Sequence, residues 1–187
     1  MERVVGINYR VALLNLNIRG LSVSIIQIYA ATETAWEEEI NTFNGAPDQA
    51  NKNYIIMGDF NAKIGQPRKD EHLVMKANGY GERNRRGQKL IDLALELKLA
   101  ILNTFFHKNP NRRWTWRSPN GEYKNEIYYV LSDQPNISQN TEVLNLNCPS
   151  AHRAVGATTA VTRQKKKRTA CKSNPHSSPK TEQEIMS

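Results

Sequence analysis

The segment at residues 54–61 constrains the fold of this chain more than any other. An apolar run ends at Gly58 and is followed by Asp59, Phe60 and Asn61. An unbroken apolar run of this length predicts a strand at residues 53–58 that is buried on both faces of a sheet. The glycine predicts a turn that projects a carboxylate and a carboxamide at the end of that strand. Asp59 and Asn61 are therefore predicted to handle a proton and to orient a phosphate.

Length and charge predict one domain followed by a basic tail. The chain has 187 residues, of which 39% are hydrophobic, and a formal net charge of +8. This is enough for one modest core. From Arg163 onward seven Lys or Arg residues stand against two Glu residues, so most of the positive charge belongs to this segment. We predict a partial domain at residues 1–162 and a disordered tail at residues 163–187, which suits either nuclear localisation, nucleic-acid contact or simple solvation.

Cysteine usage and hydropathy predict a soluble protein of the nucleus or cytoplasm. Cys148 and Cys171 make neither a disulfide framework nor a zinc spacing, so we expect free thiols and no disulfide. No stretch reaches the roughly 18–20 apolar residues of a membrane span. The N-terminus lacks the apolar segment of a signal peptide. We expect no membrane partner, and the sequence leaves the oligomeric state open.

The secondary-structure pattern predicts an α+β fold. Two strand-like runs flank a turn that contains Gly20, which indicates a hairpin. Thr34 and Glu37 form a capping box that begins a short helix, and apolar spacing predicts a second helix at residues 87–98. Hairpins outnumber strand–helix–strand units, which favours a sandwich of mainly antiparallel sheets flanked by helices. The predicted strands are 9–17, 22–29, 53–58, 100–103, a second hairpin of 114–117 with 126–131, 143–146 and 153–161; the helices are 34–44 and 87–98.

Seven motifs occur in one order along the chain, between about residue 10 and about residue 162. They are Ile28-Tyr29-Ala30-Ala31-Thr32, Met57-Gly58-Asp59-Phe60-Asn61-Ala62-Lys63-Ile64-Gly65, Gly79-Tyr80-Gly81-Glu82-Arg83-Asn84-Arg85-Arg86-Gly87, Leu102-Asn103-Thr104-Phe105-Phe106, Trp114-Thr115-Trp116-Arg117-Ser118-Pro119-Asn120-Gly121, Lys124-Asn125-Glu126-Ile127 and Ser150-Ala151-His152-Arg153. In this order the chain resembles the endonuclease/exonuclease/phosphatase superfamily. Within it, the chain is most similar to the apurinic-type endonuclease domain of RTE-like LINE retrotransposons and to craniofacial development protein 2-like proteins.

This resemblance implies a four-layer α/β sandwich that cuts DNA phosphodiesters with Mg²⁺. In such enzymes an Asp-x-Asn pair activates the attacking water or the leaving group and steadies the phosphate, and Asp59 and Asn61 match it. Tyr29 matches a tyrosine that contacts the phosphate. His152 matches the histidine of a terminal Asp-His pair, which a second aspartate orients.

Three departures from the pattern predict that activity is lost. Ala151 stands where the resemblance places a metal-side acid, and Tyr128 stands where it places the acid that orients His152. Tyr128 can donate a hydrogen bond but supplies no negative charge at neutral pH. The N-terminal part of the fold, with an asparagine and a metal-binding glutamate, would precede residue 1, so we predict a truncated fold with an uncovered sheet edge beside the strand at 9–17. Asp59 alone is predicted to bind Mg²⁺ only weakly, because the ion is commonly held by one or two carboxylates, and we assign no metal ligands.

Three hypotheses for function follow. The first is a degenerate, truncated endonuclease-like domain that is catalytically inactive. The second is an active metal-dependent nuclease or phosphodiesterase that a partner completes. The third is a non-enzymatic module that binds nucleic acid through its basic loops and tail, with Arg112, Arg113 and Trp114 as the predicted contacts to a DNA backbone. For these three residues, a solvated basic loop and a tryptophan packed in the core are the alternatives.

Overall fold

The computed structural model describes residues 3–7, 9–18, 20–30, 50–51, 53–146 and 149–160. The predicted helix at 34–44 and the predicted tail at 163–187 lie outside these residues. No helix in the described part of the chain is long and apolar enough to cross a membrane. The strands and the α-helix are β1 (Arg3–Gly6), β2 (Val11–Ile18), β3 (Leu21–Tyr29), β4 (Asn53–Asp59), α2 (Arg85–Glu96), β5 (Ala100–Ile101), β6 (Trp116–Arg117), β7 (Lys124–Asn125), β8 (Tyr128–Ser132), β9 (Ser138–Val143) and β10 (Val155–Thr159).

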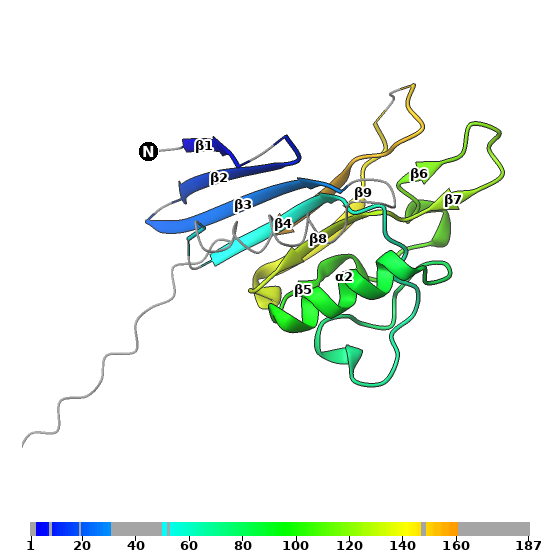
Figure 1. Ribbon diagram of the computed structural model, residues 1–187, viewed down its shortest axis with the longest axis horizontal. Helices are drawn as coiled ribbons and strands as arrows, with labels where there is room; N and C mark the ends of the chain where they lie inside the picture. Colours follow the sequence, from blue (N-terminus) through cyan, green and yellow to red (C-terminus); the bar gives the residue numbers. More distant parts are fainter. Residues whose placement is uncertain are drawn as a thin grey trace, which may run out of the picture.

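Six strands form the main sheet in the order β1-β2-β3-β4-β8-β5 (Figure 1). The predicted first hairpin is confirmed, because β2 pairs antiparallel with β3 from Val11 and Ile28 to Ile18 and Leu21. The strand predicted at 53–58 is also confirmed, and it lies parallel to β3 and antiparallel to β8. The prediction of an uncovered edge is wrong for the first half of β2, because β1 pairs with it antiparallel from Ala12 to Asn15.

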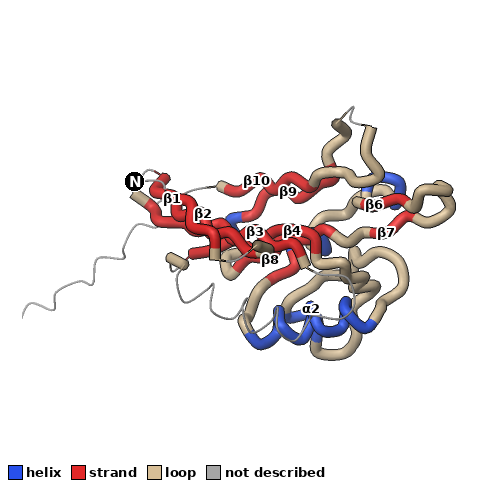
Figure 2. The backbone as a smooth tube through the Cα atoms, turned by 45° about the horizontal axis from the view of Figure 1, so that its top comes forward, coloured by secondary structure: helices blue, strands red, loops and turns tan. Residues whose placement is uncertain are grey.

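The main sheet has α2 on one face and the two-stranded β9–β10 sheet on the other (Figure 2). Alternation along β4 accounts for both layers, because successive side chains of a strand point to opposite faces. Ile56 is fully buried in the core shared with α2, whereas Ile55 and Met57 pack in the cluster shared with β10. The predicted fold class, an α+β sandwich of mainly antiparallel sheets with a flanking helix, is confirmed.

The start of α2 is fastened to the segment that follows β4. The Asn84 side chain caps the helix by accepting from the N–H of Gly87 at 2.8 Å, and it also accepts from the N–H of Lys63 at 2.9 Å. A Cβ atom at position 87 would lie 1.7 Å from the carbonyl oxygen of Lys63, so only glycine permits this approach. The helix predicted at 87–98 is confirmed and begins two residues earlier, because the cap stands at Asn84.

The second predicted hairpin is wrong in its second strand. β6 pairs with β7, at Lys124–Asn125, whereas the run from Tyr128 to Ser132 crosses into the main sheet as β8, between β4 and β5. The reason is burial on both faces of β8: Tyr129 and Leu131 enter one core and Val130 enters the other. A surface hairpin leaves one face in water, which such a run does not suit.

Two further strands differ from their predicted bounds. β9 lies at Ser138–Val143 rather than at 143–146, because its mostly polar residues carry no apolar alternation that marks a strand. β5 has only two residues and continues as a 3-10 helix at Leu102–Thr104, so the strand predicted at 100–103 is half as long.

A buried ion pair holds the long connection between β4 and α2. The Arg83 guanidinium donates to both carboxylate oxygens of Glu71, with Nη2 at 2.6 Å from Oε2, and the two side chains are 5% and 7% exposed. The N–H of Arg68 adds a third hydrogen bond to Glu71. The hydrogen bonds from Arg83 are the largest of the effects that lower the pKa of Glu71, and burial opposes them.

Stability is therefore expected to fall in acid through Glu71. A carboxyl whose pKa is lower in the folded state contributes stability above its unfolded pKa, and this contribution is lost as pH falls through the folded pKa. Urea denaturation from neutral pH to below pH 4.5, the ordinary value for this carboxyl, should show that Glu71→Gln removes part of the pH dependence of the wild-type protein. Glu82→Gln is the matched control, because Glu82 is exposed. Parallel pH profiles for wild type and Glu71→Gln would contradict the assignment.

Candidate functional site

Tyr29, Asp59 and Tyr128 lie in one row across three strands. Asp59 of β4 is the register partner of Tyr29 in β3 and of Tyr128 in β8. By alternation, all three belong to the same sheet face as Met57 and Val130, which pack toward β10. Gly58 allows the strands to approach here, because it has a φ of 152° and a Cβ atom at this position would lie 1.8 Å from the carbonyl oxygen of Ile28. The register therefore brings together three of the predicted site positions.

The predicted Asp59–Asn61 pair is formed by a tight turn at the end of β4. Asn61 has a left-handed φ of 48°, and its N–H donates to Oδ1 of Asp59 at 2.9 Å. Its Nδ2 donates to the carbonyl oxygen of Ala30 at 2.8 Å, which ties the carboxamide to the end of β3. Asp59 is 7% exposed, and burial raises the pKa of its carboxyl; the Asn61 hydrogen bond and the charges of His152 and Arg86 act in the opposite direction.

His152 approaches this row from the segment before β10. The Tyr128 hydroxyl lies 2.7 Å from Nδ1 of His152, and the two rings stack with centroids 5.6 Å apart. The pKa of Tyr128 is raised by burial and by the Asp59 and Tyr29 side chains. The phenol therefore keeps its proton at neutral pH, and it donates to Nδ1 of His152 in the tautomer that leaves this nitrogen unprotonated. At position 151 the alanine side chain is exposed, and the carbonyl oxygen of Ala151 accepts from the N–H of Arg117.

A cavity of about 250 Å³ lies between this row and the start of β10. Its lining includes Tyr29, Asp59, Tyr128 and Val155, and among the described lining residues Asp59 alone carries a carboxylate. Within the part of the chain that the structure describes, no three His, Cys, Asp or Glu side chains gather to form a metal site. Mg²⁺ is usually held through one or two carboxylates together with waters and substrate phosphates, and Asp59 is the one carboxylate that the described lining of this cavity supplies.

Arg86 adds a cation that was not among the predicted site residues. It lies in the first turn of α2, its side chain is buried, and its charge lowers the pKa of Asp59. A cation at a helix N-terminus is mildly unfavourable. That placement is the signal in the sequence that could have pointed to a use for Arg86.

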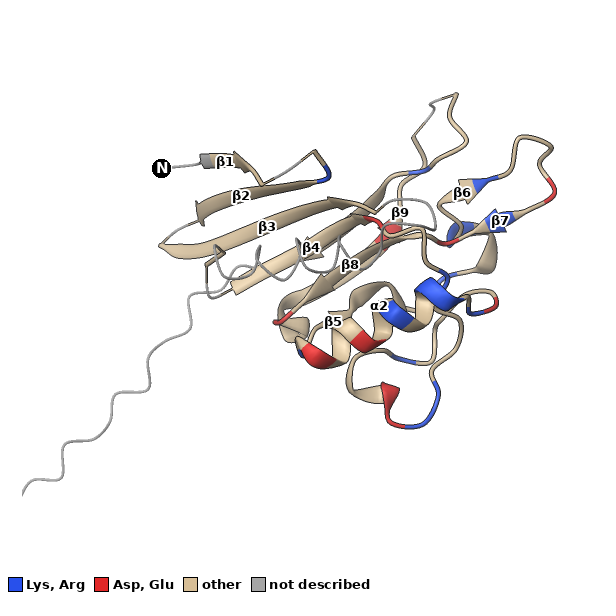
Figure 3. Cartoon of the chain, in the orientation of Figure 1, with Lys and Arg blue, Asp and Glu red and all other residues tan. Residues whose placement is uncertain are grey.

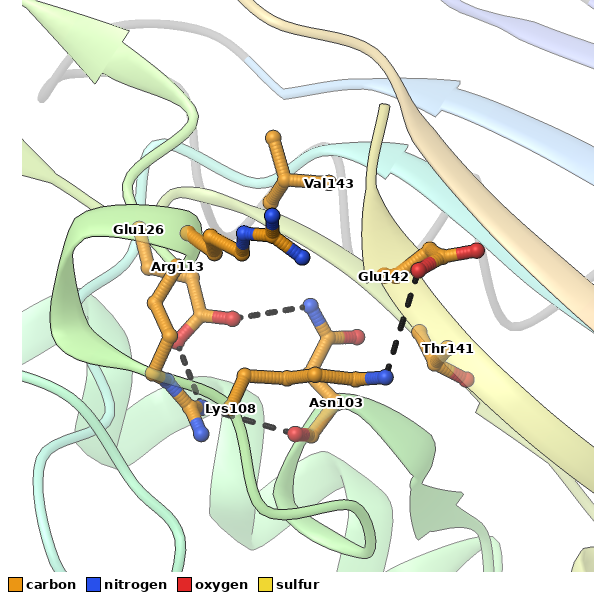
Figure 4. Close-up of a pocket in the computed structure, with 8 residues that line it drawn as sticks. Asn103, Lys108, Arg113, Glu126, Thr141, Glu142 and Val143 are labelled. Atoms are coloured by element: carbon orange, nitrogen blue, oxygen red, sulfur yellow. Dashed lines mark hydrogen bonds and ion pairs between the residues drawn. The ribbon is translucent and has the colours of Figure 1, made fainter. Parts of the chain in front are cut away.

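The predicted nucleic-acid contacts need one correction. Arg112 is exposed, as a backbone contact requires, but Arg113 is 5% exposed and forms an ion pair with Glu126 at 2.9 Å. The guanidinium of Arg113 is therefore directed toward Glu126 and is not accessible to a DNA backbone (Figure 4). Trp114 is half-buried, with the Arg153 guanidinium 4.4 Å from its ring centroid and Lys124 at 5.5 Å. Figure 3 shows Lys and Arg in β6, in β7 and at the start of α2.

The layered sheets, with an aspartate and an asparagine at the end of a central strand, define a domain of the endonuclease/exonuclease/phosphatase fold. The chain belongs to the endonuclease-reverse transcriptase family, whose model matches residues 23–156. It is 31% identical over 119 residues to craniofacial development protein 2 of Bos taurus, which covers 60% of this chain and 20% of that protein. It is 29% identical over 133 residues to craniofacial development protein 2 of Tragulus javanicus, a match that covers 68% of this chain and 23% of that protein. The chain thus spans about a fifth of the length of these relatives.

Solved structures share the fold at low sequence identity. The endonuclease domain of TRAS1, a telomere-specific non-LTR retrotransposon, matches with a TM-score of 0.64 at 14% identity, over 87% of this chain and 70% of that one. An endonuclease/exonuclease/phosphatase family protein of Leptotrichia buccalis matches with a TM-score of 0.55 at 14% identity, over 81% and 53%. Enzymes of this fold family generally use a divalent metal.

Proposed function

We propose that this chain is an endonuclease-like domain, derived from a metal-dependent DNA endonuclease, that keeps a phosphate-handling site but does not hydrolyse phosphodiesters. The observation that carries the proposal is the contact between the Tyr128 hydroxyl and Nδ1 of His152. A neutral phenol occupies the place where the resemblance expects the carboxylate that supports a charged imidazole.

The chemistry of the remaining groups supports loss of turnover. In serine proteases, the change of the orienting aspartate to a neutral asparagine lowers the rate about 10⁴-fold, because the imidazole takes the wrong tautomer. A divalent metal, when bound, stabilises the charge that develops on phosphoryl oxygens by several kcal/mol. In this chain Asp59 is the carboxylate that would hold such an ion, and Ala151 has no ligand atom in its side chain. The loss of the orienting acid and the loss of a metal ligand belong to one cooperative site, so their effects on the rate are not additive. Either loss alone is sufficient to remove most of the turnover.

Binding to a nucleic-acid backbone is the activity that the remaining surface supports. Arg112 and Arg153 lie close enough that their charges oppose each other: burial lowers the pKa of Arg153, and the charge of Arg112 adds to this effect. Lys124 and Arg153 share the ring of Trp114. A bound polyanion would reduce the electrostatic repulsion among these cations, and its binding would release counterions. We propose that Arg112, Lys124 and Arg153 contact phosphates beside His152, with Arg112 kept from the predicted set and Arg113 removed from it.

The wild-type chain is expected to bind abasic-site duplex DNA without cutting it in Mg²⁺ or Mn²⁺. Gel assays should show uncut substrate, and affinity should fall as salt rises. Asp59→Asn is the control that separates this site from a contaminating nuclease. The double variant Tyr128→Asp/Ala151→Asp should bind Mn²⁺ more tightly than wild type in a calorimetric titration, because position 151 regains the metal-side carboxylate while position 128 regains the acid that orients His152. Turnover by wild type that disappears in Asp59→Asn would show that the domain is an active enzyme.

A further inference from the structure

The backbone of Tyr128 is held by buried side chains where a neighbouring strand has ended. The carbonyl oxygen of Ile127 accepts from the N–H of Phe60 and so points toward β4. The N–H and C=O of the next residue, Tyr128, therefore point the other way, because successive residues of an antiparallel strand alternate between neighbours. On that side β5 pairs only with Leu131 and Ser132. The polar groups of Tyr128 thus lack a strand partner on this edge.

Thr115 and Asn103 take the place of that strand partner. The Thr115 hydroxyl accepts from the N–H of Ile127 at 2.9 Å and from the N–H of Tyr128 at 3.2 Å. The carboxamide of Asn103 donates to the carbonyl oxygen of Tyr128 at 3.0 Å and accepts from the N–H of Val130 at 2.9 Å. Thr115 is fully buried and Asn103 is 5% exposed, so water does not compete for these bonds.

A buried ion pair fixes Asn103 in turn. Its Nδ2 also donates to Oε1 of Glu126 at 3.1 Å, and Nη2 of Arg113 donates to Oε2 of Glu126 at 2.9 Å and to the carbonyl oxygen of Asn103 at 3.4 Å (Figure 4). Burial raises the pKa of Glu126, whereas Arg113 and Asn103 act to lower it. The carboxamide of Asn103 therefore has one orientation that satisfies Glu126, Tyr128 and Val130 together.

We infer that Thr115 and Asn103 are positioning residues for the Tyr128–His152 pair. By fixing both backbone polar groups of Tyr128, they hold its ring at the angle at which the hydroxyl meets Nδ1 of His152. Among the described residues this contact is the only hydrogen bond of the His152 ring, so its geometry depends on the placement of Tyr128. The assignment builds on the proposed site, but its readout is structural and does not depend on whether the protein cleaves DNA.

The ¹⁵N chemical shift of His152 Nδ1 tests the assignment, measured at a pH where imidazole is neutral. The difference between wild type and Tyr128→Phe defines complete loss of the hydrogen bond. Thr115→Val keeps the shape of the side chain without the hydroxyl, and it should move the shift by at least half of that difference. Thr115→Ser restores the hydroxyl and should return the shift to the wild-type value. Thr158→Val is the matched control, because Thr158 is exposed on β10.

A Thr115→Val shift equal to that of wild type in a folded protein would overturn the assignment, and so would an unchanged shift in Tyr128→Phe. Should the Thr115 variants not fold, hydrogen exchange in the wild-type protein decides. The amides of Ile127 and Tyr128 must be protected to the same degree as the amides of the core strands, because a buried hydroxyl accepts from both. Rapid exchange of these two amides would equally overturn the assignment. Cleavage of DNA by wild type would leave these results unchanged.

Discussion

Replacing Arg113 with methionine should lower the free energy of unfolding by about 3–5 kcal/mol, the range typical of breaking a buried ion pair from one side. The change leaves the Glu126 carboxylate buried without its cation, at 3% exposure, and removes the donor to the carbonyl oxygen of Asn103. Urea denaturation followed by circular dichroism measures the difference.

Arg112→Met is the matched control for this prediction. Arg112 is the neighbouring residue with the same side chain, but it is exposed, so its replacement should change stability by no more than about 0.5 kcal/mol. The double variant Arg113→Met/Glu126→Leu should regain much of the loss, since replacing both members of a buried pair with apolar residues is often neutral or stabilising. Equal effects of the Arg112 and Arg113 replacements would show that the ion pair is not buried in solution.

Gly58→Ala should abolish cooperative folding or cost at least about 3 kcal/mol. Two effects combine: a strained backbone conformation costs roughly 1–3 kcal/mol, and overpacking costs a further 1–3 kcal/mol or so. The φ of 152° disfavours a side chain, and a Cβ atom would lie 1.8 Å from the carbonyl oxygen of Ile28, which belongs to the neighbouring strand. Differential scanning calorimetry should show a much lower or absent transition.

Gly121→Ala separates the two effects. Gly121 also has a positive φ, of 77°, but a Cβ atom there would meet nothing within 4 Å. Its replacement should therefore cost about 1–2 kcal/mol, which is the conformational effect alone. A transition temperature for Gly58→Ala close to that of Gly121→Ala would mean that β3 and β4 are not packed as closely as the structure has them.

Local patterns predicted the site strands well because the relevant signals lie within a few residues of each other. The apolar run before Gly58 predicted β4, the turn at Gly20 predicted the β2–β3 hairpin, and the apolar spacing after Gly87 predicted α2. The fold class followed from these elements. The resemblance supplied Tyr29, Asp59, Asn61 and His152 as one set, and the structure brings Tyr29, Asp59 and His152 to the same end of the sheet with Tyr128.

Features that depend on distant partners were not predictable in this way. Arg113 looks like any member of a basic loop until Glu126, thirteen residues away, is placed beside it. The sequence of β8 is typical of one strand of a hairpin, and its position between β4 and β5 depends on strands that are distant in the sequence. β9 is stabilised by pairing with β10 rather than by its own polar residues. Propensity describes each segment alone, whereas burial and ion pairing depend on the whole fold.

The row of Tyr29, Asp59 and Tyr128 is set by backbone pairing on both sides of Asp59. Its arrangement thus needs no bound cation to hold it, and sliding any of the three strands by one residue would turn a site side chain into the apolar core beside α2. The backbone register that shapes the pocket therefore does not depend on hydrolysis. Under the proposed function, a lineage that lost hydrolysis would keep the backbone of this pocket for as long as the sheet itself is selected.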